Sequence, residues 1–275
     1  MSDMIGPLSA LRDWCPSPFV RGSILFQLGG WPLVLSGPGL PPLLIEALVL
    51  NHALLFAASL RPQDTLLGPN MVRLTAERAA SGDIALTFDD GPDPDTTPAV
   101  LDLLDNHGVS ASFFCVAERA RRHPNLTREI AARGHRVENH SDRHRNGFAL
   151  QGPRAIRDEI RRAQDTLADL SGRAPRFFRA PFGIRNPWIA PVLRQLDLRL
   201  VSWTRRGYDG VLGDPERVLA LLLRGFGAGD IVLLHDGYGP RDTRGRPVVL
   251  SVLPQLLEEI AVRRLRVAPL EFGDP

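Results

Sequence analysis

Two aspartates stand side by side in the stretch LTFDDGPDPDTTP, which spans residues 86–98. The residues before Asp89 and Asp90 form an apolar, β-branched run, as in a buried strand, and the Gly-Pro pair that follows is typical of a turn. Adjacent residues of a strand point to opposite faces of its sheet. Because a purely structural role would satisfy both carboxylates with difficulty, the pair indicates a site that needs two acids.

Histidines supply a second group of ionisable side chains. His140 and His144 are four residues apart in ENHSDRH, a spacing that would place both imidazoles on one face of a helical turn. One aspartate and two histidines form a ligand set suited to Zn²⁺ or a similar divalent ion, with positions left open for water. Each pattern alone has a plain alternative, since D-D-G-P is good turn chemistry and the chain has seven histidines. The conjunction of the two patterns carries the hypothesis of a metal site.

From residue 82 onward, short apolar segments alternate with helical patterns. Such alternation predicts right-handed βαβ units and a parallel sheet. Seven or so units exceed what an open sheet usually needs, so a closed barrel is favoured. The expected strands are 83–88, 110–116, 135–139, 176–180, 199–203, 230–235 and 265–270, and the expected helices are 97–108, 125–134, 152–172, 186–196, 214–225 and 248–263.

Polar and ionisable groups recur after these strands. Parallel α/β folds place their functional residues at the carboxyl ends of the strands, so these groups are expected to meet at one end of the barrel. They are Asp89 and Asp90 after the first strand, His140 and His144 after the third, RAPFG (179–183) after the fourth, WTRRGYDG (203–210) after the fifth and His235 after the sixth.

Residues 82–270 resemble the polysaccharide deacetylases, which are the NodB-homology domains of carbohydrate esterase family four. Four motifs carry the resemblance in the expected order: TFDDG (87–91), HSDRH (140–144), RAPFG (179–183) and LLH (233–235). The resemblance implies a distorted (β/α)₇ barrel of parallel strands. It also implies a metal-dependent hydrolase that removes an N-acetyl or other N-acyl group from an amino sugar in a polysaccharide or oligosaccharide.

The same resemblance implies one divalent metal ion, Zn²⁺ first and Co²⁺, Ni²⁺ or Mn²⁺ as alternatives, and a role for each matching residue. Those roles are Asp90, His140 and His144 as metal ligands, Asp89 as general base, Arg179 as the group that keeps Asp89 ionised, the backbone N–H of Phe182 as oxyanion donor, and His235 as general acid.

The fourth motif of the family departs from the usual pattern here. In SWTRRGYDG (202–210), Asp209 is expected to keep the acid that orients Arg179. Arg206 occupies a place that is often acidic, and Gly210 stands where tryptophan is common. This departure leaves the positioning of Arg179 and the shape of the sugar subsite open, while the metal chemistry is unaffected.

Composition excludes several function classes. The net charge of +2 is too small to indicate a nucleic-acid partner. The sequence contains no lysine, which excludes Schiff-base catalysis and the lysine of a phosphate-binding loop. Cys15 and Cys115 are far apart and have no metal-ligand spacing, so neither a disulfide framework nor a thiolate metal site is implied.

The chain divides at about residue 80, with a hydrophobic N-terminal extension (1–80) before the deacetylase-like barrel (81–275). From Gly22 to Leu60 the only charged residue is Glu46. Residues 40–60 would form a helix of about 31 Å, close to the thickness of a bilayer core. Glu46, Asn51 and His52 interrupt this segment on scattered sides, and the earlier segment 22–37 is short and broken by glycines and Pro32.

Three interpretations of the extension stay open: a membrane hairpin or re-entrant segment, helices packed on the barrel, or a degenerate signal peptide. Arg12 and Arg21 precede the apolar region, and Arg61 follows it. In a hairpin, both flanks would lie on the cytoplasmic face by the positive-inside rule. Membrane association motivates an alternative function, a deacetylase or deformylase of a lipid-linked amino sugar. A non-catalytic carbohydrate-binding module is a further alternative.

Overall fold

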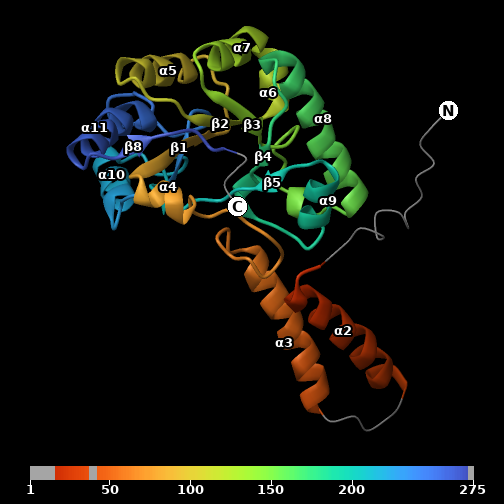
Figure 1. The fold of residues 1–275 in the computed structure, drawn as a ribbon. Helices are drawn as coiled ribbons and strands as arrows, with labels where there is room; N and C mark the ends of the chain where they lie inside the picture. Colours follow the sequence, from red (N-terminus) through yellow and green to blue (C-terminus); the bar gives the residue numbers. More distant parts are fainter. Residues whose placement is uncertain (1–15, 37–41, 272–275) are drawn as a thin grey trace, which may run out of the picture.

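The computed structural model describes residues 16–36 and 42–271. Residues 76–270 form a barrel-like body of helices around a central sheet, and two helices, α2 and α3, project from it (Figure 1). The expectations that involve Arg12 and Cys15 fall outside the described residues. Cys115 is buried and free.

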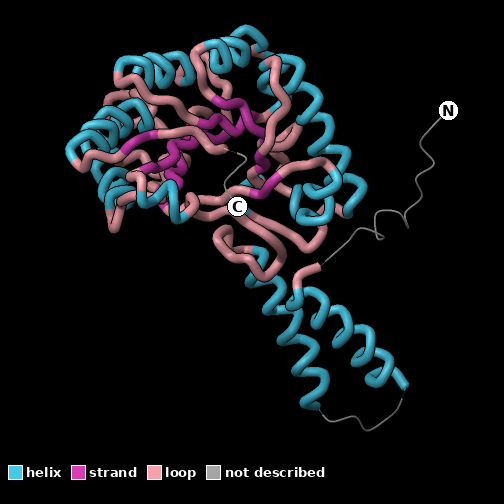
Figure 2. Tube along the Cα trace, in the orientation of Figure 1, coloured by secondary structure: helices cyan, strands magenta, loops and turns pink. Residues whose placement is uncertain are grey.

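The central sheet is a curled arc of parallel strands (Figure 2). Its main path runs β5-β4-β3-β2-β1-β7-β6, and β8 pairs with β1 off this path. This arrangement confirms the distorted (β/α)₇ barrel expected from the sequence. The strands are β1 (Asp83–Asp89), β2 (Ser112–Cys115), β3 (Arg136–Asn139), β4 (Phe177–Phe178), β5 (Arg199–Leu200), β6 (Arg205–Arg206), β7 (Ile231–His235) and β8 (Arg266–Val267).

The helices that cover the sheet match the predicted helical segments closely, but β6 and the short helices α4 and α6 were not predicted. The helices are α2 (Pro18–Ser36), α3 (Pro42–Ser59), α4 (Ala76–Ala80), α5 (Thr97–Asn106), α6 (Ala117–Arg122), α7 (Pro124–Ala132), α8 (Pro153–Ser171), α9 (Ile189–Gln195), α10 (Pro215–Leu223) and α11 (Val248–Val262), with 3₁₀ turns η1 (Phe148–Leu150) and η2 (Pro181–Gly183).

Helix α8 shows how the sequence pattern becomes packing. Ile156, Ile160, Ala163 and Leu167 recur at helical spacing, and all four are buried against the sheet side of the molecule. The helix ends at Gly172, whose φ of 71° is the left-handed conformation that favours glycine at a helix terminus. The apolar stripe and the cap together fix where β4 begins.

Strand β1 lies at the centre of the sheet and is buried along its whole length. It pairs with β2 on one side and with β7 on the other, in a register that places Asp89 beside His235. Phe88 stacks on Phe113 of β2 with ring centroids 4.9 Å apart. This rigid centre holds the carboxyl ends of β1 and β7 side by side.

The segment that leads into the barrel, residues 71–74, contacts two separate parts of the sheet. Met71 receives a hydrogen bond from the Ser202 N–H and donates its own N–H to Leu200 O. Leu74 donates to Gly229 O, just before β7. Residues 71–74 therefore tie the region beside β5 to the region that leads into β7.

The projecting helices α2 and α3 form a hairpin-like pair. Segment 22–37 was expected to be broken, but α2 runs without interruption from Pro18 to Ser36 and contains Pro32. Gly30 explains part of the difference, because a Cβ at that position would lie 2.7 Å from a methyl carbon of Leu48 on α3. The glycine does not break the helix; it lets the two helices approach closely.

Candidate active site

Asp89 and Asp90 both reach the cleft at the carboxyl end of β1. Asp89 is the last residue of the strand, and Asp90 has a φ of 75°, in the left-handed region. This conformation ends the strict alternation of side chains along the strand, so neighbouring residues need not face opposite sides. Gly91 follows and packs closely against Asp236, where a Cβ would clash with the carboxylate.

Asp90, His140 and His144 converge, with one ligand atom from each lying within 4.8 Å of the others. Asp90 Oδ1 is 3.2 Å from His144 Nε2 and 3.6 Å from His140 Nε2. That oxygen is buried and makes no hydrogen bond within the described residues. An orphaned carboxylate oxygen facing two imidazole nitrogens fits a divalent cation.

The ring of His140 is held in the orientation that a metal ligand needs. Its Nδ1 lies 2.9 Å from Arg179 O, and since a carbonyl only accepts, Nδ1 carries the proton and Nε2 keeps its lone pair. Burial, with the neighbouring His144, lowers the pKa of His140 well below its usual value. The neutral imidazole is therefore ready to donate its lone pair.

The histidines do not share a helical turn as the spacing predicted. Residues 140–144 form a loop in which Ser141 and His144 have φ values of 69° and 51°. The His144 N–H donates to Ser141 Oγ at 2.9 Å, and the Ser141 N–H donates to Asn139 Oδ1. Local side-chain bonds to the backbone thus replace the helix while still bringing both rings to one point.

Arg179 forms the closest ionic partner of Asp89. It is buried, and its Nη1 lies 2.6 Å from Asp89 Oδ1 and 2.9 Å from Thr87 Oγ1. The Nε–H donates to Val201 O, and Nη2 donates to Ser202 O. A buried arginine bonded to these four acceptors fixes the Asp89 carboxylate in one orientation.

Asp209 contacts a different residue from the one expected. Its carboxylate accepts from His235 Nδ1 at 2.9 Å and from the His235 N–H at 2.7 Å. The expectation that it orients Arg179 is wrong, because Asp209 follows β6 and lies beside β7, whereas Arg179 follows β4. Burial alone would lower the pKa of His235, but the charge and hydrogen bond of Asp209 raise it to about 9.

Changing Asp209 to Asn should therefore alter the pH profile of any reaction that uses protonated His235. Loss of the carboxylate removes the interaction that raises the His235 pKa, so the ring loses its proton at lower pH. We expect the alkaline limb of the kcat/KM profile to move down by roughly 2 pH units. Asp169→Asn, an exposed site on α8, is the matched control. An unchanged alkaline limb in Asp209→Asn would rule out this role.

Phe182 and Gly210 shape the rim of the cleft. Phe182 has a φ of 59° within η2, its ring is exposed, and the ring centroid is 4.6 Å from that of His144. Gly210 lies against the ring of His235, where a Cβ would be 3.2 Å from three ring atoms. Glycine at position 210 thus lets the backbone pack closely against the His235 ring.

A cavity of about 370 Å³ joins these groups. The sequence hypothesis brought together Asp89, Asp90, His140, His144, Phe182 and His235, and all of them line it. Arg206 also lines it, with its guanidinium over the rings of Trp203 (5.3 Å) and Tyr208 (4.6 Å). Arg179 and Asp209 are not among its lining residues, but each contacts one that is: Arg179 binds Asp89, and Asp209 binds His235.

Arg119 is a residue that sequence reasoning missed. It comes from the unpredicted helix α6, donates to the backbone carbonyl of Asp90 and lies 3.3 Å from the ring centroid of Tyr238. It therefore supports the turn that carries Asp90. No local motif marks it, because its partner is a backbone atom in a distant segment.

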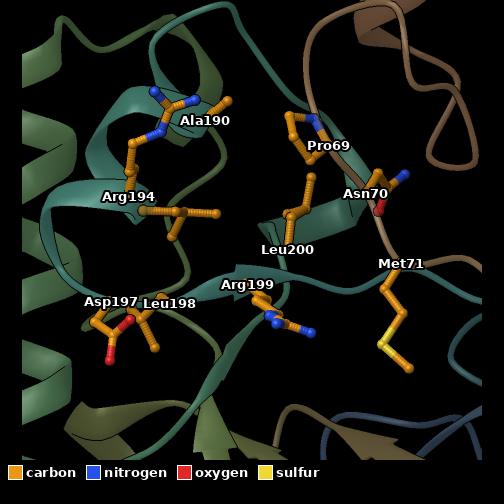
Figure 3. A pocket seen from close by; sticks show the side chains of 10 residues that line it. Pro69, Asn70, Met71, Ala190, Arg194, Asp197, Leu198, Arg199 and Leu200 are labelled. Carbon is orange, nitrogen blue, oxygen red and sulfur yellow. The ribbon is translucent and has the colours of Figure 1, made fainter. Parts of the chain in front are cut away.

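A second cavity, of about 530 Å³, lies between residues 69–71 and the α9–β5 region (Figure 3). Arg194, Asp197 and Arg199 are its charged residues. It contains neither histidine nor a cluster of metal-ligating groups, so the chemistry gathers in the cavity at the end of β1.

Known deacetylases are similar in sequence to this chain. A family profile described as polysaccharide deacetylase matches residues 76–201. A chitooligosaccharide deacetylase from Bradyrhizobium sp. (strain ANU 289) is 32% identical over 212 residues, covering 72% of this chain and 96% of that protein. A peptidoglycan-N-acetylglucosamine deacetylase from Bacillus cereus is 32% identical over 178 residues, covering 63% of each chain.

A solved structure is similar along the same region. The crystal structure of the Bc1960 peptidoglycan N-acetylglucosamine deacetylase, in complex with 4-naphthalen-1-yl-N-oxidanyl-benzamide, has a TM-score of 0.64 and 29% sequence identity. The match covers 73% of this chain and 90% of that chain.

Proposed function

Because this chain belongs to the polysaccharide deacetylase family, whose named members are hydrolases, we propose that it is a metal-dependent N-deacetylase. Its substrate is an N-acetylated, or otherwise N-acylated, amino sugar in an oligosaccharide or polysaccharide. The observation that carries the proposal is the meeting of the Asp90–His140–His144 cluster with Asp89 and His235 in one cavity.

Asp90, His140 and His144 would hold the ion. Two imidazole nitrogens and one carboxylate suit Zn²⁺ best, and Co²⁺, Ni²⁺ or Mn²⁺ are the alternatives. When bound, a divalent ion in such a site acidifies a water molecule and polarises the acyl carbonyl. The Arg179 carbonyl keeps His140 Nε2 directed at the cluster.

Asp89 is the proposed general base. Arg179 engages its Oδ1 at 2.6 Å, while Oδ2 lies 3.8 Å from His140 Nε2, on the side of the ligand cluster. Oδ2 is thus the oxygen placed to take the proton of the attacking water. The Arg179 guanidinium holds the Asp89 carboxylate so that Oδ2 stays on the side of the ligand cluster.

His235 is the proposed general acid, and the Phe182 N–H is the proposed oxyanion donor. Because His235 Nδ1 is bound to Asp209, its Nε2 is the nitrogen free to protonate the leaving amine. A pKa of about 9 keeps that ring protonated at neutral pH. One well-placed oxyanion donor contributes about 3 kcal/mol to the stability of the transition state.

Acetate or formate release from N-acylated glycans tests the proposal. We expect the full chain to release acid from N-acetylated chito-oligosaccharides or peptidoglycan fragments, to lose this activity on exhaustive chelation and to regain it with Zn²⁺ or Co²⁺. Activity that persists after complete removal of metal would contradict the metal-dependent proposal. Sugar binding without acid release from any N-acyl glycan would favour a non-catalytic binding module instead.

A lipid-linked N-acyl amino sugar is a second candidate substrate, because the base of α3 adjoins the proposed oxyanion loop. The Arg185 N–H donates to Ser59 O at 3.1 Å, and the buried Arg185 guanidinium donates to Arg61 O and Asp64 O. A Cβ at Gly183 would lie 2.8 Å from Pro62. The root of the projecting helices thus packs directly behind the loop that carries Phe182.

An apolar cavity of about 400 Å³ lies at the same junction. Residues of α2, Leu55 of α3, Pro187 and Trp188 line it. Such a lining suits a hydrocarbon chain rather than a sugar. Parallel assays of acid release from a lipid-linked N-acyl sugar and from the same sugar without the lipid discriminate the two candidate substrates. A preference for the soluble sugar would exclude the lipid-linked substrate.

A further inference from the structure

The outer surfaces of α2 and α3 are apolar on several sides. Their exposed large residues are Leu25, Phe26, Leu28, Trp31, Leu33 and Leu35 on α2, and Leu43, Ile45, Val49, Leu50, Leu54 and Phe56 on α3. Leu35 is 82% exposed and Leu43 72%. At 100° per residue, the α2 positions extend around about 220° of their helix and the α3 positions around about half of theirs, so the apolar surface is not a single stripe. Soluble proteins rarely expose an apolar surface of this extent.

The side chains of Gln27, Asn51 and Ser23 lie between the helices, whereas Glu46 and His52 are exposed. Gln27 Nε2 donates to Asn51 Oδ1 at 2.8 Å, and Asn51 Nδ2 donates to the buried Ser23 Oγ at 3.0 Å. His52 Nδ1 lies 3.0 Å from Leu48 O, within its own helix. Asn51 and His52 had been expected to interrupt the apolar segment, but hydrogen bonds satisfy them. The pair thus has apolar side chains on its outer surface and hydrogen-bonded polar side chains between its helices. A helix pair in water has the opposite arrangement.

The dimensions and charges of the pair match a bilayer. Helix α2 has 19 residues and α3 has 18, which correspond to about 28 and 27 Å against a hydrocarbon core of about 30 Å. Of the described helices, α3 alone is long and apolar enough to cross a membrane by itself, and 11% of it is buried.

The few charges on this part of the chain lie toward its ends. Glu46 is four residues from the start of α3, at the end distant from the barrel, about 6 Å along the axis. At the barrel end lie the exposed arginines Arg21 and Arg61. A carboxylate at one end and guanidinium groups at the other would each reach a headgroup layer.

We infer that α2 and α3 insert together into a lipid bilayer and hold the barrel at its surface. The occupant of their apolar surfaces is the lipid, because lipid surrounds an inserted pair and covers every side at once. A second copy of this chain would cover one side and leave the others in water. The Gln27–Asn51–Ser23 bonds hold the two helices together where no water is available to replace them.

Membrane partition of the full chain tests this inference without reference to catalysis. We expect the protein to float with vesicles of phosphatidylethanolamine and phosphatidylglycerol and to resist extraction by alkaline carbonate. The triple variant Leu25→Arg/Leu28→Arg/Leu50→Arg places charge on the lipid-facing surface and should reduce the membrane-bound fraction more than ~tenfold. Val262→Arg changes a 77% exposed residue of α11 on the barrel and should leave partition unchanged.

A second measurement does not depend on how the arginine variant folds. Trp31 lies about 20 Å along α2 from its start, so lipids brominated in the middle of the acyl chain should quench its fluorescence. Trp31→Phe should remove that quenching component. A wild-type chain that stays in the soluble fraction as a defined oligomer, without bromolipid quenching, would overturn the inference and identify a second copy as the cover.

Discussion

Replacing Asp89 by Asn is expected to lower kcat by about 10³-fold while the metal content of the protein stays unchanged. The amide cannot accept the proton of the attacking water, and loss of a general base typically costs 10²- to 10⁴-fold. Metal is retained because the ligand cluster consists of Asp90, His140 and His144. Steady-state kinetics and metal analysis of the same sample measure the two quantities.

The matched control for this variant is Asp83→Asn, at the other end of the same strand. Asp83 is equally buried and pairs with Arg78 and Arg266, so it tests the loss of a buried carboxylate without the chemistry. Asp89→Asn removes one partner of a buried ion pair, which costs roughly 3–5 kcal/mol of stability. Asp83→Asn should also lose stability, but less, because the Arg266 side chain is 66% exposed. Only Asp89→Asn should lose kcat in the fraction that is folded. Wild-type kcat in Asp89→Asn would remove the general-base assignment.

His140→Ala is expected to abolish stable metal binding and, with it, activity. His140 is buried and oriented by the Arg179 carbonyl, and its Nε2 is one of the three ligand atoms of the cluster. Loss of groups that merely orient a ligand costs 10- to 100-fold in metal affinity, so loss of a ligand itself should cost at least ~100-fold. Calorimetric titration of the metal-free protein with Zn²⁺ gives this affinity.

His135→Ala provides the comparison for His140→Ala. His135 is also buried, but its Nδ1 accepts a hydrogen bond from the Ala111 N–H, away from the cleft. This variant creates a similar internal cavity without touching the ligand cluster, so it should weaken folding and leave Zn²⁺ affinity intact. Equal Zn²⁺ affinity in the two variants would exclude His140 as a ligand.

The barrel and most of its cleft could be predicted because each depends on local patterns. Ile156, Ile160 and Leu167 repeat at helical spacing, and the apolar strands end at polar motifs, so alternation alone gives the parallel sheet and the edge where function gathers. Asp89 and His235 lie at the ends of their strands as expected, and the direct pairing of β1 with β7, which the alternation did not predict, places them side by side.

What could not be predicted depends on contacts between distant residues or on unusual backbone angles. The loop at 140–144 uses positive φ at Ser141 and His144, which the spacing of two histidines does not encode. The partner of Asp209 is decided by which strand lies beside β7. The continuity of α2 depends on packing against α3, where Gly30 meets Leu48. Helix propensity counts a glycine as unfavourable and takes no account of a second helix that packs against it.

The hydrogen bonds of Arg185 to Ser59, Arg61 and Asp64 would limit how the barrel moves relative to a membrane that holds α2 and α3. They join the barrel end of α3 to the loop that carries Phe182. With the barrel held at a bilayer as inferred above, these bonds would keep the cleft at a nearly constant height over the lipid. Distance from the bilayer would then limit which sugars the cleft reaches, in addition to their chemistry.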